Sequence, residues 1–230
     1  MRVDCEWGVH GAGTAARDVD AVVVVDVLSF STAVDIAVSR GVTVYPYPRR
    51  DKNLAEFARS IGAEVAGSRG ECRYSLSPAC YVDAEAGASV VLPSINGGAI
   101  SAALGSVTVF TGCLRNASAV ARAAGRADRV LVIPAGEQWP DGSLRPAIED
   151  WLGAGCIIDR LGGFLSAEAR VAQRGFRAAQ GGLVGLLRDS VSGRELADMG
   201  FSSDVALAAE FDVSDCAPLL REGAYVRAGG

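Results

Sequence analysis

The sequence predicts an α/β fold, a single domain over residues 1–230 with a mostly parallel central sheet flanked by helices and a helical C-terminal third. Three observations predict it. Short apolar runs alternate with amphipathic stretches as far as Pro134. A polar turn, in most cases with glycine, follows most of these runs, and 28 of the 230 residues are glycine. From Pro146 onward one helical pattern follows another.

The strongest strand signal is the run of four valines, Val22–Val25. It shows no alternation of polar and apolar residues, so we expect a strand buried on both faces in the interior of the sheet. Asp26 follows directly, where ligands bind in open α/β sheets, but aspartate is also a common helix cap. Both roles stay open for Asp26, as do capping and ligand binding for the hydroxyls of Ser29, Ser31 and Thr32.

The pattern then repeats along the chain. A helix from residue 33 to a stop at Gly41 leads into the strand VTVYPY, which together with the valine strand gives a βαβ unit. Further helices are expected at residues 51–60, 98–104 and 117–124, with strands beginning near residues 63, 89, 106 and 129. The closing stretch DCAPLLREGAYVRA is expected to add an edge strand.

If these strands are parallel, the polar residues behind them gather at one edge of the sheet with Asp26. The residues expected there are Asn96, Gly97, Arg115, Asn116 and Glu137. The stretch Glu137–Arg145 is then either a lid or a surface excursion.

Composition excludes several classes of protein. The net charge is −5 with no basic block, so we expect no nucleic-acid partner. No apolar run approaches the roughly 18 residues of a membrane span, and no export signal is visible, so we expect a cytoplasmic protein without a membrane partner. Six cysteines without a CxxC pair argue against a zinc site or a disulfide framework. Whether the chain forms a homodimer is left open.

The candidate chemistry is that of carboxylates. Mg²⁺ commonly takes one or two of them and completes its shell with water and phosphate oxygens, so it is the cofactor we expect. The single histidine, His10, excludes a zinc site of several histidines and disfavours a Ser/His/Asp triad. Glu149 and Asp150 are adjacent on an expected helix, where side chains diverge by about 100°, so at most one should reach the site; we favour Glu149. Arg69 and Arg115 carry guanidinium groups suited to an anion.

Short motifs in a fixed order then point to a family. They are Asp26-Val27-Leu28 with Ser31-Thr32, Arg69-Gly70, Ser77-Pro78, Asn96-Gly97, Asn116-Ala117, Glu149-Asp150 with Ala154-Gly155, Gly193-Arg194, and Gly200-Phe201 with Asp204-Val205. Over nearly its whole length the chain resembles the 2-phosphosulfolactate phosphatase (ComB) family. The resemblance implies a magnesium-dependent acid phosphatase with its own α/β fold, acting on a small organophosphate in the route to coenzyme M.

The chain also departs from that family's motifs. Ser29 stands in place of an arginine, Ser68 in place of an acid, Gly98 in place of a threonine and Ser192 in place of a histidine. Conversely, Arg115 replaces an apolar residue, so we predict that it compensates for the charge lost at Ser29 by reaching the same bound anion. The exact substrate stays open for this reason.

The predicted function is hydrolysis of a small anionic organophosphate by a magnesium-dependent phosphatase. Asp26, Arg69, Arg115 and Glu149 are the predicted catalytic residues, Asp26 and Glu149 (or Glu71) the metal ligands, and Ser29, Ser31, Thr32, Asn96, Gly97 and Asn116 the substrate-binding residues. Two alternatives remain: a divergent enzyme that uses the anion pocket for non-hydrolytic chemistry, and a catalytically silent sensor of a phosphorylated metabolite.

Overall fold

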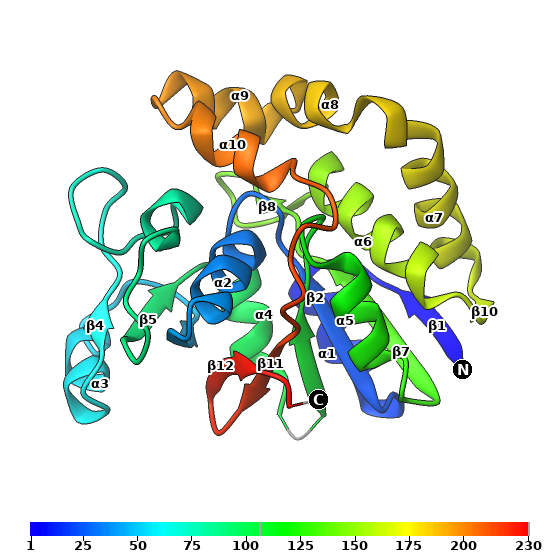
Figure 1. Cartoon of the computed structure of the whole chain (residues 1–230). Helices are drawn as coiled ribbons and strands as arrows, with labels where there is room; N and C mark the ends of the chain where they lie inside the picture. The colour runs from blue at the N-terminus through cyan, green and yellow to red at the C-terminus, as the bar shows by residue number, and fades with distance from the viewer. Residues whose placement is uncertain (106, 230) are drawn as a thin grey trace.

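A ten-stranded mixed sheet forms the centre of the computed structural model, which describes residues 1–105 and 107–229 (Figure 1). The strand order is β10-β1-β7-β2-β6-β11-β12-β3-β5-β4, and a separate two-stranded sheet pairs β8 with β9. The strands are β1 (Arg2–Cys5), β2 (Ala21–Val25), β3 (Thr43–Tyr47), β4 (Glu64–Val65), β5 (Ser89–Pro93), β6 (Thr108–Thr111), β7 (Arg129–Pro134), β8 (Glu137–Gln138), β9 (Leu144–Arg145), β10 (Phe164–Leu165), β11 (Pro218–Arg221) and β12 (Ala224–Arg227).

Helices flank this sheet, and those of the C-terminal third form an arch along the top of the view in Figure 1. The helices are α1 (Gly8–Ala15), α2 (Phe30–Ser39), α3 (Leu54–Ser60), α4 (Gly97–Ala103), α5 (Ala117–Ala124), α6 (Ile148–Leu161), α7 (Ala167–Ala179), α8 (Leu183–Asp189), α9 (Val191–Asp198) and α10 (Ser202–Ala208), with short 3₁₀ turns at Ala16–Asp18, Pro78–Tyr81 and Gln180–Gly182. The predicted fold class is therefore confirmed.

Strand β2 is the interior strand that its valines predict. It pairs in parallel with β6 on one side and β7 on the other, and all five of its residues are buried. Val23 and Val25 belong to the core on one face of the sheet, whereas Val22 and Val24 belong to the core on the other. Two apolar faces explain why the run shows no alternation.

The order of the strands corrects two predictions. Strand β3 is not the neighbour of β2, because β6, β11 and β12 lie between them, so β2, α2 and β3 do not form an adjacent βαβ unit. The closing stretch forms a hairpin, β11 and β12, in the interior of the sheet and not at its edge. In addition, β1 was not predicted, and it pairs in parallel with both β7 and β10. The predicted strand near residue 106 begins at Thr108, and Ser106 lies outside the described residues.

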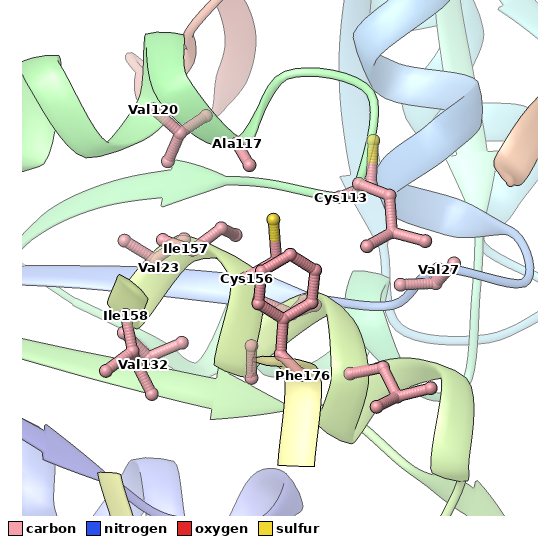
Figure 2. Close-up of a cluster of buried hydrophobic side chains, with 14 of the residues drawn as sticks. Val23, Val27, Cys113, Ala117, Val120, Val132, Cys156, Ile157, Ile158 and Phe176 are labelled. Carbon is pink, nitrogen blue, oxygen red and sulfur yellow. The ribbon is translucent and has the colours of Figure 1, made fainter. Parts of the chain in front are cut away.

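Helix α6 packs on β2 and β7 and anchors the core drawn in Figure 2. Ile157 and Ile158 of α6 lie there beside Val23 and Val132, and Phe176 of α7 closes the cluster. The two helices approach so closely that a Cβ at Gly155 would lie 2.2 Å from the carbonyl oxygen of Ala172. Only glycine fits at that position. The hydrogen bond from the Val27 amide to Asp150 joins the first turn of α6 to the segment that follows β2.

The cysteines are free thiols, as the absence of paired motifs predicts. Cys5, Cys113, Cys156 and Cys216 are buried, Cys80 is half-buried and Cys72 is exposed. Within residues 1–105 and 107–229, no helix combines the length and the apolar character that a bilayer crossing requires.

Candidate active site

Asp26 lies at the carboxyl end of β2 and is 5 % exposed. Its Oδ1 accepts a hydrogen bond from the Phe30 amide at 3.1 Å, and its Oδ2 accepts one from the Gly97 amide at 2.8 Å. The first contact caps α2, as the capping role of Asp26 predicts, and the second joins β2 to the N-terminus of α4. A Cβ at Gly97 would lie 2.8 Å from Oδ2 of Asp26 and 2.5 Å from the Phe30 ring, so the backbone reaches Asp26 because residue 97 is glycine.

Four acidic side chains surround this point, and we call them the carboxylate cluster: Asp26, Glu137, Glu149 and Asp150. Glu149 and Asp150, in the first turn of α6, are 2 % and 3 % exposed. Asp150 accepts hydrogen bonds from the amides of Val27 at 2.7 Å and Gly136 at 2.8 Å, so it joins the segments that follow β2 and β7. Glu149, in contrast, has no hydrogen-bond partner within the described residues, and its carboxylate remains available to a ligand.

Burial and mutual repulsion raise the pKa of most of the carboxylate cluster. Desolvation raises the pKa of Asp26, opposed by the two amides it accepts from and by Arg69, and Glu149 raises it further. Desolvation followed by the charges of Asp26 and Glu149 raises the pKa of Asp150 well above its ordinary value. For Glu137, desolvation and the charge of Asp26 raise the pKa to about 7. Burial therefore favours the protonated forms of Asp26, Asp150 and Glu137, and a cation bound beside them would favour the ionised forms.

The charge of the Arg69 guanidinium acts on Asp26, and the contacts of Arg69 hold it in place. Nη2 donates to Oγ of Ser29 at 3.1 Å, while Nη1 pairs with Oδ2 of Asp204 at 2.7 Å. Asp204 belongs to α10 and is fully buried, and its Oδ1 accepts from the Ser77 hydroxyl at 2.6 Å. The Arg69 guanidinium also lies 5.7 Å from the centroid of the Phe201 ring. Asp204 and Phe201, at the start of α10, thus hold Arg69 in the loop that follows β4.

A cavity of about 220 Å³ adjoins the carboxylate cluster. Glu137 and Asn96 both line it, and the Asn96 side-chain amide donates to Oε2 of Glu137 at 2.7 Å. The hairpin of β8 and β9 forms one wall, so the stretch Glu137–Arg145 is an ordered element beside the site. A concave space beside convergent polar groups is the usual form of a small-molecule site.

The hydroxyls of Ser31 and Thr32 are used within the protein, and both residues are fully buried. Oγ of Ser31 accepts from the Asp26 amide and is hydrogen-bonded to the Thr111 hydroxyl. Oγ1 of Thr32 donates to the carbonyl of Val27 at 2.7 Å. These contacts shape the turn after β2, and the structure does not place either hydroxyl where a substrate would meet it.

Arg115 and Asn116 are likewise not brought to the carboxylate cluster. Nε of Arg115 pairs with the buried Asp35 of α2 at 3.1 Å, and Nη1 pairs with Glu210. Asn116 is fully buried, and its side-chain oxygen accepts from the Cys113 amide at 2.9 Å. The prediction that Arg115 compensates for the charge lost at Ser29 is therefore wrong in its geometry. The guanidinium that contacts Ser29 is that of Arg69.

Two residues of the carboxylate cluster were not predicted as site residues. Glu137 was placed at the correct edge of the sheet, but its role was left open. Asp150 was set aside because adjacent helical residues diverge. It nevertheless accepts hydrogen bonds from two backbone amides of segments that precede α6, whereas the Glu149 carboxylate has no hydrogen-bond partner within the described residues. Glu71, the alternative metal ligand, is exposed on the loop that follows β4. The signal for Asp150 was the Glu-Asp pair at the start of a helix.

The chemistry of these donors fits a hard cation. Within residues 1–105 and 107–229, no three His, Cys, Asp or Glu side chains are arranged to hold a metal ion. Mg²⁺ does not need such a cage, because one or two carboxylates with water and phosphate oxygens complete its octahedron. Glu149, with no hydrogen-bond partner within the described residues, is the buried carboxylate best suited to this. Asp26 is the second candidate from its place at the carboxyl end of β2, although, like Asp150, it already accepts from two amides.

Comparison with known proteins identifies relatives of the chain. The family model described as 2-phosphosulpholactate phosphatase matches residues 11–223. A protein of Pseudothermotoga lettingae named "Probable 2-phosphosulfolactate phosphatase" is 28 % identical over 139 residues, which is 60 % of this chain and 60 % of that protein. The matched residues 11–223 include the whole carboxylate cluster, Arg69 and Asp204.

Proposed function

Since the chain belongs to the 2-phosphosulfolactate phosphatase family, we propose that it is a magnesium-dependent phosphatase of a small, anionic phosphate monoester. The observation that carries the proposal is the carboxylate cluster beside a cavity, with the Arg69 guanidinium bound to Ser29, three residues beyond Asp26. Buried carboxylates in excess of nearby cations repel a phosphate ester, so an anionic substrate requires a bound divalent cation there.

Asp26 and Glu149 are the residues that would hold Mg²⁺. When bound, the ion neutralises phosphoryl oxygens and lowers the pKa of a coordinated water. Arg69 would bind a phosphoryl oxygen with the guanidinium edge left free by Ser29 and Asp204. Asp150 positions the turns after β2 and β7 through its two amide contacts, so the spacing between Asp26 and Glu137 is fixed before the substrate binds.

Hydrolysis breaks the bond between phosphorus and the ester oxygen, adds the elements of water, and releases an alcohol and inorganic phosphate. Two routes are compatible with the site. In the first, a carboxylate of the cluster accepts the proton of the attacking water. In the second, a carboxylate oxygen of Asp26 attacks phosphorus, and water then hydrolyses the phosphorylated Asp26. Acid quenching during turnover followed by mass spectrometry distinguishes them, because only the second route adds a phosphoryl group to Asp26.

The test of the function is phosphate release from a panel of small phosphate esters with Mg²⁺ and with a chelator. We expect release that requires Mg²⁺ and that falls by orders of magnitude in Asp26→Asn. Asparagine accepts from only one of the two amides that Asp26 binds, which costs about 1–3 kcal/mol, but it also removes a buried charge, so the variant should fold. Glu71→Gln, on the exposed loop, is the matched control.

Near-normal release by Asp26→Asn would exclude Asp26 as the metal ligand. Thermal stabilisation by the esters without any release would contradict the phosphatase and would support the sensor.

A further inference from the structure

A second groove lies between helix α5 and the hairpin of β11 and β12 (Figure 1). Its volume is about 590 Å³, within the range of roughly 300–1,000 Å³ typical of drug-sized ligands. It shares none of its described lining residues with the cavity beside the carboxylate cluster. The proposed phosphatase reaction uses no residue of this groove.

Four guanidinium groups and one carboxylate border the groove, and they belong to Arg122, Arg126, Arg221, Arg227 and Asp215. All four arginines are exposed, and they come from α5, from the turn after it, from β11 and from β12. The formal charge of this rim is four minus one, or +3, on a chain whose net charge is −5. Like charges gathered from separate elements repel one another, so the rim favours an anion.

Most of these guanidinium groups are available to a ligand. Among the described residues, Arg227 pairs with Asp215 at 3.0 Å, whereas the side chains of Arg122, Arg126 and Arg221 donate no hydrogen bond. The hydrogen bond and charge of Arg227 and, more weakly, the charge of Arg122 lower the pKa of the Asp215 carboxyl group. Arg122 is thus close enough to act on the same anion as Arg227. Guanidinium groups pair with phosphate oxygens in a bidentate manner.

The floor of the groove is apolar and is kept open by small side chains. Ala119 and Ala123, four residues apart on α5, line one side of it, and Ala217 before β11 lines the other. Phe110 and Leu219, which are partners across β6 and β11, also contribute to it. Longer side chains at the alanine positions would fill this space. A ligand can therefore cover the floor with an uncharged part while its anionic groups meet the rim.

We propose that this groove binds a nucleoside diphosphate. Its two phosphate groups carry about three negative charges near neutral pH, which matches the formal charge of the rim. The flat base suits the floor, and guanidinium groups also stack on aromatic rings. Inorganic pyrophosphate satisfies the rim alone and a nucleoside the floor alone, so only the joined ligand uses both. The inference goes beyond the proposed function, and its test needs neither Mg²⁺ nor turnover.

Calorimetric titration of the full chain at pH 8 with a chelator tests the proposal. Without Mg²⁺ the buried carboxylates of the cluster disfavour a phosphate, so binding at that site is suppressed. The probes are ADP, inorganic pyrophosphate and adenosine. We expect the Kd for ADP to be at least about tenfold lower than that for either part alone. Absence of ADP binding, or pyrophosphate or adenosine binding as tightly as ADP, would overturn the proposal.

A double variant at the rim locates the site. In Arg122→Gln with Arg221→Gln we expect the Kd for ADP to rise at least about tenfold, because two charge-assisted contacts are lost. Arg17→Gln with Arg174→Gln makes the same change of net charge at exposed positions outside the groove and should leave the Kd unchanged. ADP affinity unaffected by the rim variant would mean that ADP binds elsewhere, and the assignment would be wrong.

A variant of the floor tests the place of the base. Ala123→Leu extends a side chain of α5 into the groove, so the Kd for ADP should rise at least about fivefold while that for pyrophosphate stays the same. Ala178→Leu, at an exposed position of α7, is the matched control. Equal ADP affinity in Ala123→Leu and the wild type would refute a base on the floor of the groove.

A second copy of the chain is the competing occupant of the groove. Sedimentation velocity without nucleotide distinguishes it, because the exposed rim of a ligand site leaves the oligomeric state of the rim variant equal to that of the wild type. A dimer of the wild type that dissociates in Arg122→Gln with Arg221→Gln would identify the groove as an interface between copies and would overturn the ligand site.

Discussion

Glu137 should make the metal-free protein less stable as pH rises, and replacing it by glutamine should remove that loss. The ordinary pKa of its carboxyl group is 4.5, and desolvation with the charge of Asp26 raises it to about 7 in the folded protein. Between these two values the folded state binds more protons than the unfolded state, so the free energy of unfolding falls with rising pH across that window. The difference of about 2.5 pKa units corresponds to about 3 kcal/mol above pH 7.

Glu137→Gln should gain this amount at pH 8 and almost nothing at pH 4.5, because its Oε1 still accepts from Asn96. For a chain of this size, about 3 kcal/mol raises Tm by roughly 6–12 °C. Calorimetry with a chelator at both pH values measures the difference, and Glu71→Gln on the exposed loop should show none. A gain equal at both pH values, or a loss at pH 8, would refute the argument that burial and neighbouring charge disfavour the Glu137 carboxylate.

Three further predictions concern the surroundings of the site. Asp204→Asn weakens the hold on Arg69, so steady-state kinetics should show KM for the phosphate ester rising about tenfold with kcat changing less; an unchanged KM would refute the positioning role. Gly97→Ala puts a methyl group 2.5 Å from the Phe30 ring and should lower the free energy of unfolding in urea by about 1–3 kcal/mol. Arg115→Ala leaves its buried partner on α2 without a cation and should cost about 3 kcal/mol, yet phosphate release per folded molecule should not change.

Sequence reasoning correctly predicted the features that a local sequence pattern determines. The valines of β2 identify a strand with two buried faces, and Asp26 follows at its end wherever the strand lies in the sheet. The Asn96-Gly97 turn was correctly placed beside Asp26, because a turn after a strand, followed by a helix, brings amides to the carboxyl end of the sheet. Glu149 was also correctly placed near Asp26, since burial of its helix is encoded in its apolar face.

Sequence reasoning failed where contacts between residues distant in the chain determine the position of a side chain or of a strand. Arg115 is drawn away from Asp26 by Asp35 and Glu210, which lie 80 and 95 positions away in the chain. Ser31 was predicted as a possible ligand donor, but its hydroxyl is hydrogen-bonded to that of Thr111, 80 positions away in the chain. No local pattern records such pairs. The order of the strands is hidden for the same reason, because the pairing of β3 with β12 joins Val44 to Tyr225, which are distant in the sequence.

The interior position of the β11 and β12 hairpin has a consequence for synthesis of the protein. β10, β1, β7, β2 and β6 form one parallel set and β3, β5 and β4 another, and the strands of residues 218–227 lie between them. As the chain leaves the ribosome, the facing edges of β6 and β3 therefore stay open until the hairpin has emerged. The sheet closes only after residues 218–227 have been synthesised, and the nascent chain exposes two unpaired strand edges to chaperones or to neighbouring chains until then.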